Sequence, residues 1–390
     1  MLDARAILAE AEAIAGFGNN DAHLHRNLEA LVDSLNGDAK LNPSGEAAAR
    51  RGLVARQADR IAGLKWSANY PEIADEVIEC PVFLCGLPRS GTTYFQYLFD
   101  RDRRFRLIRT WQSLMPLPPP GFDPQSVTQR KAMEEERRAA LRPKAVENFA
   151  ALHLLDADGP DECHALLEQT GAAAGFFNLY DVPRYFDYLM NEADLVAAYA
   201  SHKRQLQLLQ WRLPKCAWAL KYPNHIIAMD SILNVYPDAR FAITHRDPLQ
   251  VLASIAKMSL SLRTARYDAV DPHRVGGQML DFIDRHIQRI MALADGPNAD
   301  RAVHVDYYAL VADPGGTMAK VHGGLGLPSP DDVMAAITGW RRENPKNARG
   351  ANDYALAQFG LSADEAEERF AAYRRRFAIP READALAAIS

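Results

Sequence analysis

Apolar residues recur at spacings of three and four positions through residues 1–75, for example at Leu28, Leu31, Val32 and Leu35. This spacing predicts amphipathic helices. Four short and largely apolar runs further along the chain instead predict buried strands of a parallel sheet. They lie at residues 81–85, 216–220, 240–244 and 302–305.

Helical patterns follow these runs. They cover residues 224–235, 248–258, 307–325, 331–343 and 362–376. Alternation of strands and helices is typical of an α/β fold, so we expect a P-loop-like parallel sheet flanked by helices. Residues 125–213 form a helical insertion, either a substrate lid or plain structural helix. We expect an N-terminal helical region, residues 1–75, to pack on a core formed by residues 76–390 as one structural unit.

The composition narrows the class of protein. The chain has 390 residues, of which 48% are hydrophobic, and a formal net charge of -5, which argues against bulk electrostatic binding of nucleic acid. Its four cysteines have neither metal-site spacing nor the pattern of a disulfide framework. The N-terminus does not resemble a signal peptide, and no apolar run approaches the ~18 residues of a membrane span. We therefore expect a cytoplasmic enzyme without a transmembrane segment or a metal; the sequence does not indicate the oligomeric state.

A glycine-containing loop follows the first predicted strand. Residues 86–93 read GLPRSGTT, the outline of the phosphate-binding pattern G-x-x-x-x-G-K-[ST], with Thr92 in the place of lysine. Backbone N–H groups at the start of the next helix make an anion site by geometry and dipole. The loop therefore predicts a phosphate or sulfate site. Its groups are Arg89, Ser90, Gly91, Thr92 and Thr93.

A second group of polar residues follows the strand predicted at 240–244. Arg246 stands at the strand end, Pro248 suits the first turn of a helix, and Ser254 lies eight positions after the arginine. An arginine and a helical hydroxyl so placed predict a second phosphate site. A nucleotide kinase would also want the loop lysine and an acid for magnesium after an apolar strand. This chain lacks the loop lysine, and after the strand the basic residues His245 and Arg246 precede the first acid, Asp247.

Together these two groups resemble the nucleotide-binding elements of sulfotransferases that use 3′-phosphoadenosine 5′-phosphosulfate (PAPS). Pro88 to Thr93 match the family's P-[RK]-[ST]-G-T-[TS] loop, which holds the 5′-phosphosulfate. Arg246 and Ser254 match the spacing of its 3′-phosphate element. The N-terminal helices and the closing segments resemble a bacterial branch of the family, so the likeness covers nearly the whole chain.

The resemblance implies further site residues. Lys221, in the segment WALKYP, is similar to the family's lysine that faces the sulfate donor. Tyr307 matches the tyrosine of a Y-x-x-L-x-x-D-P element near the nucleotide, with Tyr308 as the less favoured register. The basic loop at 344–353 approximates a family loop that closes on the 3′-phosphate. Its candidates are Lys346, Arg349 and Gly350.

The resemblance implies transfer of a sulfuryl group from PAPS to an acceptor hydroxyl, with adenosine 3′,5′-bisphosphate as the product. Arg89 and Lys221 would stabilise the charge on the leaving phosphate. The acceptor must lose a proton to a general base. Many relatives have a histidine two residues after the lysine, where this chain has Pro223, so the base is open between Glu162 and His225, with His164 as a third option.

The acceptor is not readable from the sequence beyond a small molecule. Aromatic and apolar residues at Trp111, Met115, 116–120, 176–177 and Tyr180 are either core or the lining of a pocket for a lipophilic alcohol or phenol. Two alternative functions remain: an atypical P-loop nucleotide kinase and a non-catalytic nucleotide-binding protein.

Overall fold

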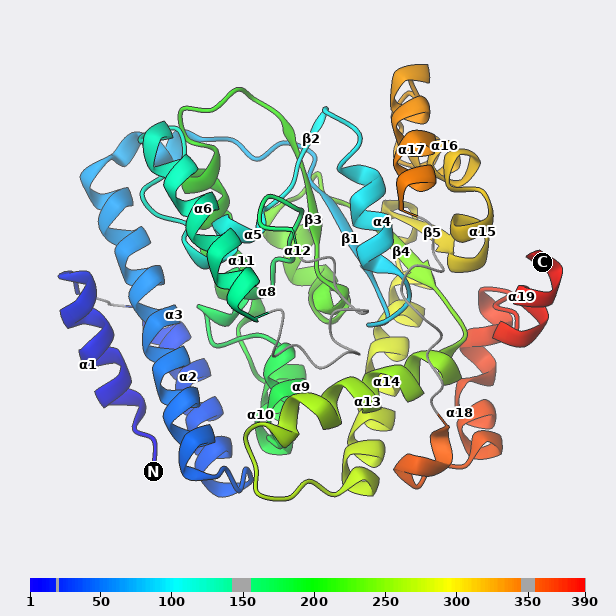
Figure 1. The fold of residues 1–390 in the computed structure, drawn as a ribbon, viewed down its shortest axis with the longest axis horizontal. Coiled ribbons are helices and arrows are strands. Elements are labelled where there is room, and N and C mark those ends of the chain that lie inside the picture. The colour runs from blue at the N-terminus through cyan, green and yellow to red at the C-terminus, as the bar shows by residue number, and fades with distance from the viewer. Residues whose placement is uncertain (19–20, 142–155, 345–354, 390) are drawn as a thin grey trace.

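A parallel five-stranded sheet forms the centre of the protein (Figure 1). The computed structural model describes residues 1–18, 21–141, 156–344 and 355–389. The strands are β1 (Val82–Gly86), β2 (Phe105–Arg106), β3 (Ala217–Lys221), β4 (Arg240–His245) and β5 (Ala302–Asp306).

The strand order is β2-β3-β1-β4-β5, so β1 lies between β3 and β4. Leu84 of β1 is in register with Lys221 of β3 on one side and Ala242 of β4 on the other. The connection that follows β1 runs to β2 on one side of the sheet, whereas the connection that follows its neighbour β4 runs to β5 on the other side, which places the switch point between the carboxyl ends of β1 and β4. Open α/β sheets bind their ligands at such a point.

Alternate side chains of β1 enter two different hydrophobic clusters, because successive residues of a strand point to opposite faces. Phe83 and Cys85 belong to the larger cluster, which also holds helices of the N-terminal region. Val82 and Leu84 belong to a second cluster with residues of the helices on the other face. Burial on both faces explains why the strands read as continuous apolar runs.

The N-terminal region consists of three helices and a short 3₁₀ turn. They are α1 (Ala4–Ala15), α2 (Ala22–Gly37), α3 (Pro43–Asn69) and η1 (Pro71–Asp75). The side chain of Asn42 accepts a hydrogen bond from the Gly45 N–H and so caps α3, which has Pro43 in its first turn. Leu28 and Leu31 of α2 are buried in the larger cluster with Phe83, so this region shares a core with the sheet.

Between β1 and β3 the described residues are mainly helical. The helices are α4 (Thr92–Phe99), α5 (Thr110–Leu114), α6 (Pro124–Leu141), α8 (His164–Glu168), α9 (Gly175–Leu179), α10 (Pro183–Asn191) and α11 (Leu195–Gln210). The predicted helical insertion is thus confirmed for its described part. The sequence did not predict β2, a two-residue edge strand that is too short to show a pattern.

The C-terminal half alternates helices with β4 and β5. Its elements are η3 (Pro223–Ala228), α12 (Met229–Val235), α13 (Pro248–Thr264), α14 (Pro272–Ala294), η4 (Ala299–Arg301), α15 (Tyr307–Ala312), α16 (Pro314–Gly324), α17 (Asp331–Glu343), η6 (Leu356–Phe359), α18 (Ala363–Arg376) and α19 (Glu382–Ile389). The helix predicted at 224–235 begins as a 3₁₀ segment because the His225 N–H bonds to the Tyr222 carbonyl. Helix α14 was not predicted.

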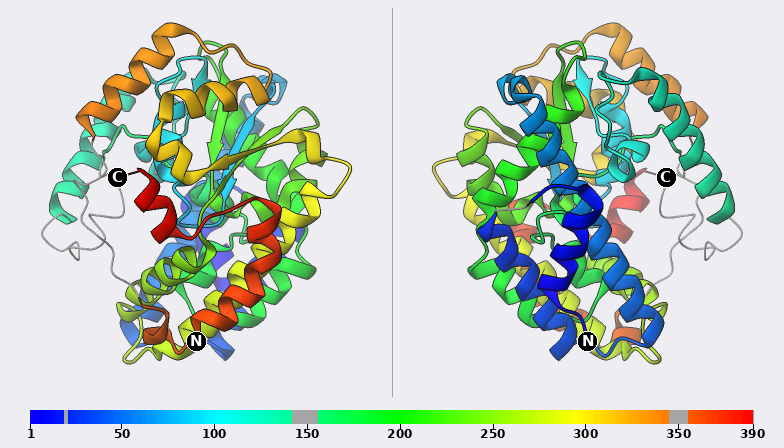
Figure 2. Two further views of the ribbon diagram at one scale, coloured as in Figure 1. Left: turned by 90° about the vertical axis from the view of Figure 1, so that its right-hand side faces the viewer. Right: turned by 90° about the vertical axis from the view of Figure 1, so that its left-hand side faces the viewer.

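The two ends of the chain lie on opposite sides of the molecule. Figure 2 shows the N-terminal helices in blue on one side and helices α18 and α19 in red on the other. None of the helices in the described ranges has both the length and the apolar composition that a bilayer crossing demands. The predicted α/β architecture, with a parallel sheet between helices, is confirmed.

Candidate active site

The loop after β1 has a backbone that only certain residues tolerate. Gly86 has φ +148°, and a Cβ there would lie 2.4 Å from the Thr244 hydroxyl oxygen and 2.9 Å from that of Ser90. Gly91 has φ +89°, and a Cβ there would lie 2.4 Å from the ring of Tyr307. Arg89 adopts φ 72°, an uncommon conformation for a residue with a side chain. The loop is therefore pressed between β4 and the start of α15.

Ser90 fastens this loop through its hydroxyl and its backbone N–H. Its buried hydroxyl donates to the Leu87 carbonyl at 2.6 Å and hydrogen-bonds with the Thr244 hydroxyl at 2.6 Å. Its backbone N–H also donates to the Leu87 carbonyl, at 3.1 Å. The N–H and the hydroxyl of Ser90 thus hold the loop in this structure, and the role of Ser90 in anion binding stays a prediction.

Helix α4 begins directly after the loop, so its N-terminus lies near the carboxyl end of β1. Gly91 is the N-cap and has no side chain with which to cap the helix. The first N–H groups of a helix have no intrahelical partner and carry the positive end of the helix dipole. The N–H groups of Thr92 and Thr93 are therefore suited to an anion.

Lys221 brings a positive charge to the same N-terminus. Its Nζ donates to the Thr93 hydroxyl at 3.2 Å and forms an ion pair with the Glu162 carboxylate. The lysine side chain is 1% exposed, whereas that of Glu162 is 22% exposed. A buried cation and a more accessible carboxylate thus meet beside the first turn of α4.

Backbone contacts fix Glu162 next to β3. Its N–H donates to the Asp161 carboxylate at 2.8 Å, and the next N–H, of Cys163, donates to the Lys221 carbonyl at 2.8 Å. Asp161 is held in turn by its N–H bond to the Ile108 carbonyl. The backbone of Glu162 therefore has a defined position, two residues before α8.

His225 lies near Lys221, but its hydrogen bond is to a residue of the core. His225 is fully buried, its Nδ1 lies 2.6 Å from the Tyr199 hydroxyl, and its ring lies edge-on to Phe83. Burial, together with nearby His202 and Lys221, lowers the pKa of His225 well below its ordinary value and so favours the neutral ring. His164, the first residue of α8, lies with its ring 6.5 Å from that of Tyr222.

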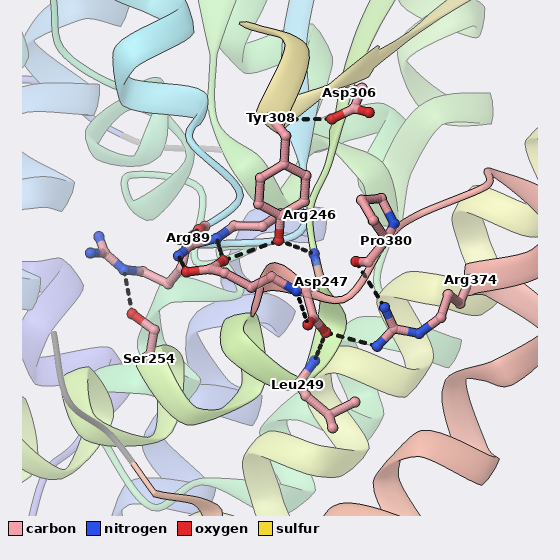
Figure 3. Close-up of polar contacts among 10 residues, drawn as sticks. Arg89, Arg246, Asp247, Leu249, Ser254, Asp306, Tyr308, Arg374 and Pro380 are labelled. Carbon is pink, nitrogen blue, oxygen red and sulfur yellow. Dashed lines mark hydrogen bonds and ion pairs between the residues drawn. The ribbon is translucent and has the colours of Figure 1, made fainter. Parts of the chain in front are cut away.

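The two groups of residues that were predicted to bind phosphate lie next to each other at the loop after β1 (Figure 3). Arg89 donates its Nε–H to the Ser254 hydroxyl at 3.1 Å. Arg246 donates through Nη1 to the Arg89 carbonyl at 3.0 Å, and through Nε and Nη2 to the carboxylate of Glu382 at 2.8 Å each. Arg89, Arg246 and Ser254 therefore form one cluster rather than two separate sites.

Tyr307 and Tyr308 take different positions. The ring of Tyr307 packs on Gly91 and lies 4.7 Å from the Arg246 guanidinium carbon. The Tyr308 hydroxyl donates to Glu382 at 3.1 Å. The favoured register thus places Tyr307 beside the loop and Tyr308 behind the arginine.

Several predicted residues do not add to the site. Lys346, Arg349 and Gly350 lie outside the described residues. The aromatic candidates for an acceptor pocket belong to the core, since they are 2–8% exposed: Trp111, Phe176, Phe177 and Tyr180. Phe177, for instance, stacks on Phe186 with ring centroids 4.4 Å apart. Spacing alone did not separate core from pocket here.

Sequence reasoning missed two residues that shape the cluster. Thr244, the last residue but one of β4, contacts the loop through the hydroxyl of Ser90. Glu382, the first residue of α19, occupies one edge of Arg246. An isolated acid 136 residues from its arginine gives no sequence signal, whereas a threonine in the register of Gly86 follows once the strand pairing is known.

No group of three or more His, Cys, Asp or Glu side chains in the described ranges is arranged to hold a metal ion. The positively charged or partly positive groups near the carboxyl ends of the strands are the first N–H groups of α4 and the side chains of Arg89, Lys221 and Arg246. Such a set is suited to a polyanionic ligand.

Comparisons with known proteins agree with this geometry. Residues 81–331 match the model of the sulfotransferase family. The structure is similar to that of sulfotransferase STF9 from Mycobacterium avium, with 25% sequence identity, a TM-score of 0.89 and coverage of 98% of both chains. It is also similar to sulfotransferase STF1 from Mycobacterium tuberculosis H37Rv, with 27% identity, a TM-score of 0.83 and coverage of 95% of this chain and 99% of that one. No curated protein sequence matches the chain. With its family model spanning well over half of its length, this chain belongs to the sulfotransferase family.

Proposed function

We propose that the protein transfers a sulfuryl group from PAPS to a hydroxyl of a small-molecule acceptor and releases adenosine 3′,5′-bisphosphate. One observation carries the proposal: Arg89 of the loop after β1 is hydrogen-bonded to Ser254 of α13. This contact joins a helix N-terminus suited to one anion with a group suited to a second. A nucleotide that carries both a 5′-phosphosulfate and a 3′-phosphate has that pattern of charge.

Each group has a proposed role. The N–H groups of Thr92 and Thr93 with Lys221 and Arg89 would bind the phosphosulfate and stabilise charge on the leaving phosphate oxygen. Arg246 and Ser254 would bind the 3′-phosphate. Gly91 and Tyr307 would shape the loop, and Arg349 and Gly350 remain proposed contacts of the 3′-phosphate.

Glu162 is the better supported general base. The acceptor oxygen forms a bond to sulfur while the bond from sulfur to the phosphate oxygen breaks, and the acceptor proton passes to the base. A base must reach the acceptor, and the Glu162 side chain is 22% exposed beside Lys221. His225 is fully enclosed by aromatic rings, which favours a structural role for it.

The acceptor side is proposed only as a class. The cationic and N–H groups described above are all assigned to the donor, and Glu162 is the one carboxylate that we place toward the acceptor. A neutral hydroxyl compound, such as a phenol or a lipophilic alcohol, fits a site in which the carboxylate must take up one proton.

Binding and turnover test the proposal separately. The unfolding temperature is measured with adenosine 3′,5′-bisphosphate and, in parallel, with ATP and magnesium; we expect stabilisation by the bisphosphate at lower concentration. Transfer of ³⁵S from labelled PAPS to a panel of phenols and alcohols then measures turnover. A stronger response to ATP would contradict the proposal and favour a nucleotide kinase.

A matched pair of variants sharpens the binding test. Arg246→Ala should reduce the response to the bisphosphate, because it removes a proposed contact of the 3′-phosphate. Arg103→Ala removes an exposed arginine and should leave the response unchanged. Binding without transfer to any acceptor would favour a non-catalytic nucleotide-binding protein.

A further inference from the structure

The guanidinium of Arg246 is held along one whole edge by a carboxylate from the C-terminal helix. Nε and Nη2 each donate to one oxygen of Glu382, both at 2.8 Å. This parallel two-bond arrangement fixes the plane of the guanidinium as well as its position. The two side chains are 20% and 19% exposed, so the pair lies partly shielded from solvent.

Glu382 is itself held by neighbouring groups. The Tyr308 hydroxyl donates to its Oε2 at 3.1 Å, and its backbone N–H donates to the Asp247 carboxylate at 2.9 Å. Asp247 also accepts from Arg374 of α18 at 2.8 Å. Ala385 of the same helix packs against Tyr308. The carboxylate therefore cannot leave Arg246 without losing its hydrogen bond from Tyr308, while the other contacts hold the backbone of Glu382 in place.

The remaining sides of Arg246 are also defined. Nη1 donates to the Arg89 carbonyl at 3.0 Å, and the ring of Tyr307 lies 4.7 Å from the guanidinium carbon. A guanidinium has five N–H donors. Three are engaged, which leaves one on each terminal nitrogen without a partner among the described residues. These two donors form the part of Arg246 that a ligand can use.

We infer that Glu382 is a positioning residue, which holds Arg246 so that its two remaining N–H donors meet the 3′-phosphate of the bound nucleotide. The inference rests on the proposed function. Glu382 does not touch the ligand; it removes the rotational freedom of the guanidinium before binding, so less entropy is lost when the phosphate arrives. The opposite reading is a carboxylate that competes with the phosphate for Arg246, and the contacts that fasten Glu382 disfavour it.

The test compares two ligands that differ only in the 3′-phosphate. Dissociation constants of adenosine 3′,5′-bisphosphate and adenosine 5′-monophosphate are measured by calorimetry with the full chain. Glu382→Ala should weaken bisphosphate binding by about 10-fold, the equivalent of one hydrogen bond to a charged group, and leave the monophosphate unchanged. Glu382→Gln keeps one acceptor oxygen and should have a smaller effect in the same direction.

Two further variants serve as controls. Asp384→Asn neutralises an exposed acid of the same helix and should bind both ligands as the wild type does. Arg246→Ala should abolish the preference for the bisphosphate, and adding Glu382→Ala to it should change nothing more. In steady-state assays the Glu382 variants should raise the KM for PAPS and leave kcat within about twofold, because the reacting groups are untouched.

The outcomes are separable. Tighter bisphosphate binding in Glu382→Ala would show that the carboxylate competes with the phosphate, and it would overturn the inference. An equal loss of affinity for both ligands would also overturn it, because such a loss indicates general damage to the fold. Unfolding temperatures identify such damage, and Glu382→Gln retains the shape of the side chain if the alanine variant unfolds. A wild type without preference for the bisphosphate would overturn the proposed function and this inference together; a preference that survives in both Glu382 variants would overturn the inference alone.

Discussion

Arg89 and Ser254 are 165 residues apart in the chain, and the Nε of the arginine lies 3.1 Å from the hydroxyl oxygen of the serine. The contact exists because β1 and β4 are adjacent parallel strands, so the segments that follow them emerge at the same edge of the sheet. The two phosphate motifs are therefore parts of one cluster, in which a change to either residue affects the other.

Ser254→Ala should weaken binding of adenosine 3′,5′-bisphosphate by about 3- to 10-fold, because it removes both the partner of Arg89 and a proposed phosphate contact. Arg89→Lys should have a comparable effect. Since the two residues share a hydrogen bond, the double variant should lose less than the sum of the single changes. Isothermal titration of all four proteins measures this coupling.

The matched control is Ser261→Ala, which changes an exposed serine of the same helix. Its affinity should equal that of the wild type. Strict additivity of the Arg89 and Ser254 changes would argue that their hydrogen bond has no part in binding.

Lys221→Met should lower kcat by about 100-fold or more, because it removes the cation that we propose stabilises the leaving oxygen, while the bisphosphate still binds within a few-fold. The change keeps the packing of a side chain that is 1% exposed. The control is Lys215→Met, which changes an exposed lysine two residues before β3 and should retain full activity. Single-turnover transfer of ³⁵S measures the chemical step directly.

Glu162→Gln should reduce kcat by about 100- to 10,000-fold, the range of general acid–base catalysis, with bisphosphate binding retained. His225→Asn should instead lower the free energy of unfolding and leave kcat within a few-fold, because the ring is fully buried. The exposed Glu135 provides the control substitution Glu135→Gln. If His225→Asn folds normally but is inactive while Glu162→Gln is active, the assignment of the base is wrong.

Gly91→Ala should disrupt the loop. A Cβ at this position would lie 2.4 Å and 2.6 Å from ring carbons of Tyr307, and φ is +89°. We expect a loss of about 1–3 kcal/mol in the free energy of unfolding. Affinity for the bisphosphate should fall as well, because the N-terminus of α4 moves. Chemical denaturation and calorimetry measure the two effects.

Gly277→Ala is the matched control for this substitution. Gly277 lies within α14, where a Cβ meets no atom within 4 Å. Alanine there should be neutral or stabilise by about 0.5–1 kcal/mol, since it restricts the unfolded chain. An equal loss of stability in both variants would refute the argument from Tyr307.

How far the sequence predicted this structure depends on whether each signal was local. The strands, the loop and the spacing from Arg246 to Ser254 are short-range patterns, and they predicted the parallel sheet, whereas its strand order needed the structure. The sequence did not predict that Ser90 would face Thr244, since that contact depends on strand pairing. It also gave no sign of Glu382, whose partner is fixed by the path of the C-terminal helices.

Buried histidines should make the protein less stable in mild acid. Burial lowers the pKa of His202 to about 3 and that of His286 to about 4, from 6.5. Below pH 6.5 the unfolded chain binds protons that the folded protein does not, so the free energy of unfolding falls as the pH drops from 6.5 toward 4. The loss should be roughly 1 kcal/mol per histidine and pH unit.

Denaturation at a series of pH values between 4.5 and 7.5, about the range in which histidine titrates, measures this slope. His202→Asn should make the slope shallower, whereas His273→Asn changes an exposed histidine and should leave it as it is. A slope in His202→Asn equal to that of the wild type would show that His202 takes up its proton at the same pH in the folded and the unfolded protein.

β3, β1 and β4 are neighbours in the sheet, so the groups at their ends can stay in place when the segment between β2 and β3 changes. The groups at the ends of these strands are spaced by the sheet itself, about 4.8 Å from one strand to the next. The long segment between β2 and β3 brings in Glu162 but adds no strand among its described residues. Insertions or substitutions in that segment can reshape what surrounds Glu162 while the strand ends keep their spacing. Under the proposed function, such changes would alter which acceptor is bound and leave the binding of the donor as it is.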